Sequence, residues 1–267
     1  MPHLPRLFRH GGAALSCAVL LLSFGSAHAK ALDLKSSDGL ILHNADGESV
    51  KFKGHSALQI SSSTPPASDQ QRLDHLALVE GLEFTNGTIE VDLAGQPSPG
   101  ATGGARGFVG VAFRVQEDRE TYDCFYLRPT NGRAEDQERR NHTVQYMSHP
   151  DFPWRKLRTE TPSRYESYVD ITPATWIHVR LEVDGAKARL FIDDREQPTL
   201  IVNDVKSGED ASGSVAIWFE GSIIAHAKKN LKITPRWIDS GKLTISRNRS
   251  GIPSALKLWR ARKPDPL

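Results

Sequence analysis

The stretch that decides the fold runs from Gly107 to Tyr146 and reads GFVGVAFRVQEDRETYDCFYLRPTNGRAEDQERRNHTVQY. Three segments in it, 109–115, 122–128 and 143–146, alternate apolar and polar residues with a period of two. This period is typical of β-strands that bury one face and leave the other open to solvent or to a ligand. The stretch therefore predicts three short strands, which we expect to be antiparallel neighbours.

The alternation also assigns each side chain of these strands to a face. The apolar row consists of Val109, Val111, Phe113, Val115, Phe125, Leu127 and Val144. The opposite row carries the polar side chains Arg114, Tyr126, Arg128 and Gln145, which we interpret as one exposed surface and as the candidate binding site. Tyr146, which ends the third segment, and Trp154, in the stretch beyond it, complete the predicted substrate-binding set.

The first 29 residues predict export. They have a basic start, an apolar stretch from Ala13 to Phe24 and a small-residue end, Ala27-His28-Ala29. This is the layout of a secretory signal peptide removed before Lys30, and the apolar stretch is too short for a membrane span. We therefore expect a periplasmic or secreted protein that is not attached to a membrane once the signal peptide is removed.

Charge and cysteine content narrow the function classes. The whole chain has a formal net charge of +2, but residues 1–29 carry two arginines and no acids, so the mature chain is expected to be neutral. A nucleic-acid partner gets no support from such a balance. Cys17 leaves with the signal peptide, and the remaining Cys124 cannot form an intramolecular disulfide. We interpret Cys124 as a small packing residue rather than a nucleophile, because no base is adjacent in the sequence.

Alternating segments and turn signals fill the rest of the mature chain, and no long stretch has an apolar period of 3.6 residues. Asp-Gly pairs at 38–39, 46–47 and 184–185, and Asn-Gly at 86–87, are hairpin signals. The prediction is an all-β fold, an antiparallel two-sheet jelly-roll sandwich over residues 30–235, monomeric, followed by an appendage at 236–267.

A pair of acids in the segment TIEVDL is the candidate catalytic pair. Glu90 and Asp92 lie at i and i+2 and point to the face opposite Ile89, Val91 and Leu93. Such residues are roughly 6.5 to 7 Å apart along a strand, near the spacing at which an acid and a base can flank a glycosidic bond. The alternative is that the two acids pair with Arg114 or Arg128 on adjacent strands, or face water.

Two further stretches bear on ligands. The glycine-rich loop 95–106 lacks the pattern of a phosphate-binding loop, and no acidic loop has calcium-binding spacing, so no cofactor or metal is predicted. Residues 148–175 lose the strand period but keep four aromatic residues, Phe152, Trp154, Tyr165 and Tyr168. These rings either form a wall on which sugars stack or close one end of the core. His178 is interpreted as a surface residue.

Several segments together resemble a known family. GTIEVDL, GFVGVAFRV, YDCFYLRPTNG, HTVQY, TWIHVRLEVDGAKARLFID and GSVAIWFEG, in this order, are similar to the concanavalin A-like jelly rolls. More narrowly they resemble exported laminin-G-like domains of bacteria, grouped with the 3-keto-disaccharide hydrolase or family 16 glycoside hydrolase-like domains. The resemblance implies a carbohydrate ligand on the concave sheet or its rim loops.

One departure from that family bears on mechanism. Glu90 and Asp92 match two acids of the glucanase strand motif, but Ala94 and Gly95 stand where the third should be, which argues against a retaining glucanase. In the 3-keto-sugar enzymes a single base and a cation such as Arg114 or Arg128 would suffice. Two functions therefore stay open: an exported enzyme that cleaves or modifies a glycan, and a non-catalytic glycan-binding or cell-envelope domain.

Overall fold

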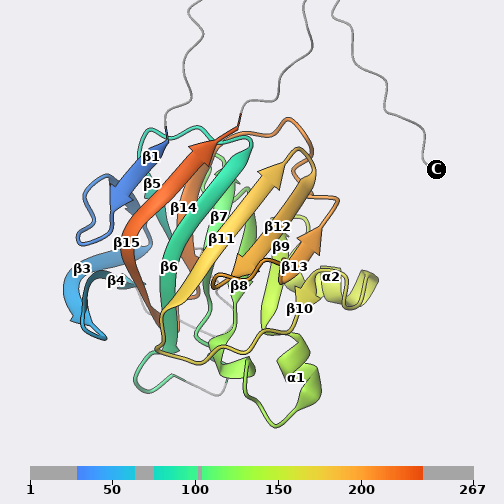
Figure 1. Cartoon of the computed structure of the whole chain (residues 1–267), viewed down its shortest axis with the longest axis horizontal. Coiled ribbons are helices and arrows are strands. Elements are labelled where there is room, and N and C mark those ends of the chain that lie inside the picture. The colour runs from blue at the N-terminus through green and yellow to red at the C-terminus, as the bar shows by residue number, and fades with distance from the viewer. Residues whose placement is uncertain (1–28, 64–74, 102–103, 237–267) are drawn as a thin grey trace, which may run out of the picture.

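The computed structural model describes residues 29–63, 75–101 and 104–236 (Figure 1). Two antiparallel sheets, here called sheet A and sheet B, are stacked on one another, so the predicted all-β sandwich is confirmed. The predicted signal peptide and C-terminal appendage lie outside the described residues, apart from Ala29 and Arg236.

Sheet A has the strand order β13-β12-β11-β6-β15-β4-β3, and β1 also pairs with β15. Its strands are β1 (Lys30–Asp33), β3 (Ala45–Phe52), β4 (His55–Ser62), β6 (Gly87–Pro97), β11 (Ile177–Asp184), β12 (Lys187–Ile192), β13 (Leu200–Val202) and β15 (Ile223–Pro235). In Figure 1 this sheet is the front layer, with β6 and β15 side by side at its centre.

Sheet B has the order β10-β9-β8-β7-β14-β5-β2. Its strands are β2 (Leu40–His43), β5 (His75–Val79), β7 (Val109–Val115), β8 (Tyr122–Leu127), β9 (Val144–His149), β10 (Glu166–Ser167) and β14 (Ser214–Phe219). The helices are η1 (Pro129–Asn131), α1 (Gln137–Asn141) and α2 (Trp154–Glu160). Figure 1 shows α1 and α2 near the β9–β10 edge of this sheet.

The three central strands are arranged as the period predicts. β7 pairs antiparallel with β8, and β8 with β9, so that Tyr126 lies beside Gly110 on one neighbour and Gln145 on the other. Residues paired in this way share a face of the sheet. The apolar row that starts at Val109 faces sheet A, because the Val109 side chain lies against the backbone of Gly95 in β6.

The outer face of these strands is also buried, which corrects the expectation of an exposed polar row. Every residue of β7 and β8 is buried, and helix α2 packs against β9. Large side chains on this face also cover one another, as when Trp218 packs on Tyr126 with 4.9 Å between the ring centroids. The polar side chains therefore lie in a packed layer rather than in water.

One predicted hairpin turn is confirmed and another is wrong. Asp184-Gly185 joins β11 to β12, as predicted. The hairpin predicted at Asp46-Gly47 is wrong, because both residues lie inside β3 and pair with β4. That hairpin turns instead at Lys53-Gly54, where φ is 47° and 79°. Two successive positive φ angles match the right-handed twist of the flanking strands.

Candidate functional site

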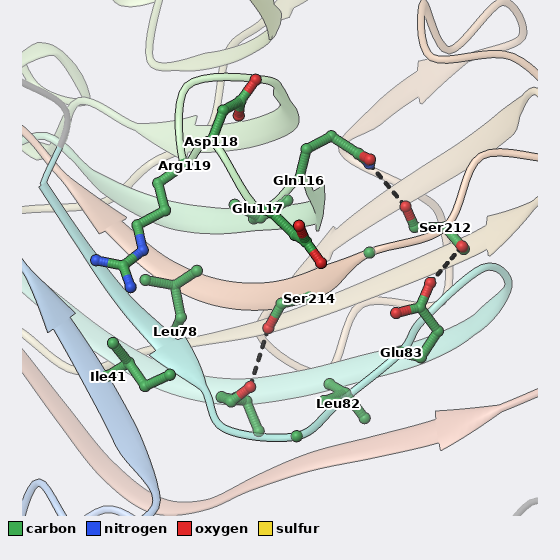
Figure 2. Close-up of a pocket in the computed structure, with 14 residues that line it drawn as sticks. Ile41, Leu78, Leu82, Glu83, Gln116, Glu117, Asp118, Arg119, Ser212 and Ser214 are labelled. Carbon is green, nitrogen blue, oxygen red and sulfur yellow. Dashed lines mark hydrogen bonds between the residues drawn. The ribbon is translucent and has the colours of Figure 1, made fainter.

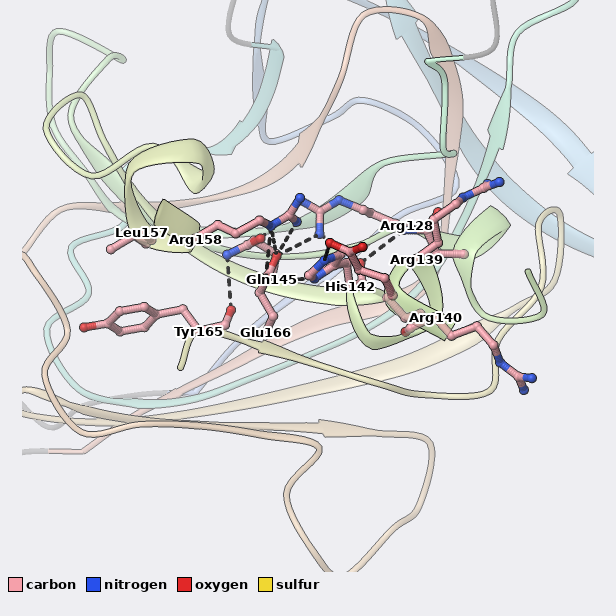
Figure 3. Close-up of polar contacts among 12 residues, drawn as sticks. Arg128, Arg139, Arg140, His142, Gln145, Leu157, Arg158, Tyr165 and Glu166 are labelled. Carbon is pink, nitrogen blue, oxygen red and sulfur yellow. Dashed lines mark hydrogen bonds and ion pairs between the residues drawn. The ribbon is translucent and has the colours of Figure 1, made fainter. Parts of the chain in front are cut away.

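Arg128 is the centre of a buried polar network on the outer face of sheet B (Figure 3). Its Nη2 donates to the Tyr126 hydroxyl at 2.7 Å and to Gln145 Oε1 at 3.2 Å, and its Nη1 donates to the carbonyl of His142 at 2.8 Å. The alternation places Arg128, Tyr126 and Gln145 on one surface, and the structure brings all three into contact. Their role in binding stays a prediction.

Glu166 in β10 supplies the negative charge of this network. Its Oε1 lies 3.7 Å from Arg128 Nη1, and its Oε2 lies 2.8 Å from His142 Nδ1. Arg158 of α2 reaches the same carboxylate, with Nε 2.9 Å from Oε1 and 3.2 Å from Oε2. Sequence reasoning missed Glu166 and Arg158, because residues 148–175 show no period that assigns a side chain to a face.

Burial sets the protonation of the network. Burial is the main cause that raises the pKa of Tyr126 to about 12, so its hydroxyl is protonated at neutral pH. Burial also lowers the pKa of Arg128, opposed by the nearby Tyr126 and Glu166. An arginine nevertheless remains charged in proteins, and a buried charge is tolerated only where partners surround it. The network is therefore a fixed array of donors held under α2.

A band of six rings crosses the same face, and we call it the aromatic band. Its members are Phe108, Tyr122, Tyr126, His149, Trp154 and Trp218. Trp218 Nε1 donates to the Tyr122 hydroxyl at 3.0 Å, and the Tyr122 ring stacks on His149 at 5.1 Å. On the other side, Phe108 lies 5.9 Å from the Tyr126 ring, and the Arg128 guanidinium lies 5.6 Å from the centroid of the Trp154 ring. Phe108, His149 and Trp154 are only half-buried.

Arg114 does not belong to this surface, which corrects the prediction. It has a φ of 55° at a break in the pairing of β7 with β14. A bulge of this kind redirects the side chain. Its guanidinium donates to the carbonyls of Thr85, Gly185 and Gly208, at 2.7 to 3.1 Å. Arg114 therefore ties together loops at one end of the sandwich.

Tyr146 is also wrongly placed by the prediction. It pairs with Phe125 in the register of β8 and β9, and so lies in the row that faces sheet A. Its hydroxyl donates to Asp123 Oδ1 at 2.6 Å and accepts from the backbone N–H of Lys206 at 2.7 Å. Burial, and next the charge of Asp123, raise the pKa of Tyr146 well above its ordinary value. Tyr146 is a buried structural residue.

Glu90 and Asp92 lie on the outer face of sheet A, so they share no face with Arg128 and Gln145 of sheet B. The alternative that they pair with Arg114 or Arg128 is wrong, because β6 runs between β11 and β15. The cations beside them come from those strands: Lys232 Nζ lies 3.4 Å from Glu90 Oε2, and Lys228 Nζ lies 4.0 Å from Asp92 Oδ2.

The surroundings of Asp92 form a second polar cluster. His178 Nδ1 lies 2.7 Å from Asp92 Oδ1, although the sequence predicts His178 to be a plain surface residue. The ammonium of Lys228 lies 4.5 Å from the centroid of the Trp176 ring. A carboxylate bonded to one ring nitrogen orients an imidazole for proton transfer. In the described part of the chain, no group of three or more His, Cys, Asp or Glu side chains is arranged to hold a metal ion.

An open pocket of about 810 Å³ lies at the β2–β5 side of sheet B, far along the strand order from β9 and β10 (Figure 2). Ile41, Leu78 and Leu82 contribute its apolar lining. Its polar groups join the loops to one another, as where Gln116 Nε2 donates to the carbonyl of Ser212 at 2.7 Å. We assign this pocket no ligand. Among the described residues, no helix has the length and apolarity needed to cross a membrane.

No family model and no curated protein matches the chain. The carbohydrate-binding module CBM66 from Bacillus subtilis is a similar solved structure, with 14% identity and a TM-score of 0.49 over 73% of this chain and 96% of that chain. A β-glucanase from Bacillus licheniformis has 13% identity and a TM-score of 0.39 over 80% of this chain and 95% of that chain.

The exoplasmic/lumenal domain of VIP36, in a form bound to Ca²⁺ and Man3GlcNAc, has 9% identity and a TM-score of 0.43 over 80% of this chain and 91% of that chain. Identities and scores this low leave the function of the chain to be argued from its own residues. The narrower resemblance to the 3-keto-disaccharide hydrolase group stays a prediction.

Proposed function

We propose that this chain is a carbohydrate-binding domain whose ligand lies on the aromatic band of sheet B. The observation that carries the proposal is the band itself, in which half-buried Trp154 and Phe108 lie next to the buried donors of Arg128. Sugar rings pack their apolar faces on aromatic side chains, and sites for small ligands combine such apolar area with a few fixed polar groups. The half-buried rings are the part of the band that a ligand can reach, since Arg128 and Gln145 are only 4% and 0% exposed and bond to one another.

The fixed geometry of the polar network favours binding. Arg128 and Gln145 are buried and already held by Tyr126 and by backbone carbonyls. They form a rigid floor under the half-buried rings, so the ring surface loses little conformational entropy when a ligand arrives, which favours affinity. The band thus offers a preorganised surface.

The placement of the carboxylates favours binding over cleavage at this surface. Most glycosidases use two carboxyl groups about 5 to 9.5 Å apart on either side of the bond. Glu166 contacts both Arg128 and Arg158 and its side chain is only 3% exposed, so it is not open to a glycosidic bond. Glu90 and Asp92, the predicted catalytic pair, lie on sheet A. The aromatic band therefore lacks the pair that hydrolysis would use among the described residues.

A second candidate function is acid–base chemistry on sheet A. The observation that favours it is the contact of 2.7 Å between Asp92 and His178. Asp92 would orient His178 as a general base, and Lys228 would stabilise a developing oxyanion, in keeping with a substrate that carries a carbonyl next to the abstracted proton. This arrangement uses Asp92 but not Glu90.

Export is part of the proposal. A periplasmic or secreted, monomeric protein that begins at Lys30 would meet polymeric glycans outside the cytoplasm. N-terminal sequencing of protein from a periplasmic fraction tests this, and an intact Met1 there would contradict it.

Screening on a panel of glycans tests the function. Protein lacking residues 1–29 is titrated with neutral and acidic oligosaccharides, and both bound ligand and released sugar are measured. We expect saturable binding with no released product. Release of sugar that is lost in His178→Ala would instead support the second candidate, and no binding to any glycan would overturn the proposal.

A further inference from the structure

The charge around the aromatic band narrows the class of ligand, and this inference rests on the proposed function. Three guanidinium groups lie near the Trp154 ring. Their distances from its centroid are 4.6 Å for Arg158, 5.2 Å for Arg155 and 5.6 Å for Arg128. One half-buried indole is therefore surrounded by three positive charges.

A second group of arginines meets the first at Arg128. Arg106 lies two residues before Phe108 of the band and is half-buried. Burial lowers its pKa, and the charges of Arg139 and Arg128 lower it further. The carbonyl of Arg106 accepts from the backbone N–H of Thr130 in η1 at 3.2 Å, and η1 follows directly on Arg128 and contacts α1, so the backbones of the three arginines border one turn. Arg139 is exposed on the short helix α1.

The carboxylate in contact with this set offsets only part of its charge. Glu166 contacts Arg128 and Arg158 and so balances one of the five arginines. Glu138, on α1, lies 3.8 Å from His142 rather than against an arginine. Like charges brought together repel, and this repulsion is relieved when an anion arrives. The excess is local, because the mature chain has no net formal charge.

We propose that the ligand is an acidic oligosaccharide, whose rings lie on Trp154 and Phe108 while its carboxylate or sulfate groups are bound by Arg155 on one side and by Arg106 and Arg139 on the other. The guanidinium group presents parallel N–H donors that match two oxygens of such an anion at once. Arg139 and Arg155 are exposed and Arg106 is half-buried. Arg128 and Arg158 hold the site together through Glu166.

Matched pairs of ligands test the charge requirement. Isothermal titration compares oligogalacturonate with its carboxyl-reduced neutral form, and dextran sulfate oligosaccharides with dextran. We expect at least one acidic ligand to bind tenfold or more tightly than its neutral partner, with an affinity that falls when salt rises, because exposed charges are screened. Equal affinity for both members of each pair contradicts this inference and leaves the proposed function standing. If the protein binds neither member of either pair and binds no other glycan, the result counts against the proposed function itself.

Matched variants test the position of the anion. Arg139→Gln and Arg106→Gln are each expected to weaken binding of the acidic ligand at least fivefold and to leave binding of the neutral partner unchanged. Arg180→Gln is the control, because Arg180 lies over Phe191 on sheet A and its loss changes the net charge equally. An equal loss in all three variants would show that net charge alone attracts the ligand, and would overturn the assignment of the site.

Discussion

Replacing Glu166 by glutamine removes the negative charge of the buried network and leaves the shape of the side chain almost unchanged. The Glu166 and Arg128 side chains are only 3% and 5% exposed, whereas Arg158 is 30% exposed and can turn its charge toward water. Breaking a buried ion pair by removing one partner costs about 3 to 5 kcal/mol. We assign the cost of a broken buried pair to Arg128 and almost none to Arg158. We therefore expect Glu166→Gln to lower the free energy of unfolding by about 3 kcal/mol.

Urea denaturation followed by tryptophan fluorescence measures this change. With a denaturant slope of about 2 to 3 kcal/mol/M, the midpoint should fall by about 1 to 1.5 M. Glu90→Gln is the matched control, because Glu90 and Lys232 are 29% and 53% exposed and such pairs contribute about 0 to 1 kcal/mol. A midpoint for Glu166→Gln within the error of the control would refute the reasoning, since Arg128 would then not depend on this carboxylate.

Arg114→Leu should lower the free energy of unfolding by about 3 to 5 kcal/mol, because it removes a buried guanidinium and leaves three partly buried carbonyls without their donor. Arg119→Leu, in the neighbouring turn, should change it by less than about 0.5 kcal/mol; equal midpoints in urea would contradict the buried role of Arg114. His226 is 3% exposed and stacks on Phe52 at 3.8 Å, and burial lowers its pKa from 6.5 to about 4. The folded state therefore binds the proton less well than the unfolded chain, and stability present above pH 6.5 should be lost as the pH falls toward 4, by about 2 to 3 kcal/mol. His226→Gln should reduce this loss in a series of denaturation curves between pH 7.5 and 4; an unchanged pH dependence would show that His226 is solvated.

The parts of the site that the sequence predicts are those on regular strands. Tyr126, Arg128 and Gln145 follow the period of two, and their shared face results directly from the pairing of β8 with β9. Their burial could not be predicted in the same way. Periodicity assigns a side chain to a face, but what covers that face depends on distant segments such as α2.

Arg114 shows that one irregular residue can break the alternation from which its face was predicted. The alternation of β7 holds up to Phe113 and then breaks at the bulge opposite β14. The bulge could not be foreseen, because it results from pairing with a strand about one hundred residues away. A single extra residue moves a side chain to the other face.

Glu90 and Asp92 show the limit set by topology. Their outward direction on a strand is predicted correctly, because Ile89, Val91 and Leu93 are buried. Which sheet the strand joins is not encoded in its period. Pairing with β11 and β15 puts the acids on sheet A, beside His178 and Lys228.

No periodicity in the sequence marks Glu166 or Arg158 as part of a site. Arg158 lies on a two-turn helix and Glu166 on a strand of two residues, both inside a stretch without strand period. Aromatic residues in that stretch are the one signal available. Tyr165 is buried in the core and Phe152 packs against it, as the second interpretation of these rings expects, whereas a sugar wall at Trp154 stays a prediction.

The central claim is that a carbohydrate binds the outer face of sheet B at Trp154. The most direct measurement compares Trp154→Ala with Trp176→Ala, since both indoles are half-buried and each lies near a cation, but on opposite sheets. Loss of an aromatic contact of about 1.5 kcal/mol corresponds to roughly tenfold in affinity. Titration with the tightest ligand of the glycan panel should show at least a tenfold loss for Trp154→Ala and none for Trp176→Ala, with both variants folded by circular dichroism. A loss confined to Trp176→Ala would place the ligand on sheet A and contradict the claim.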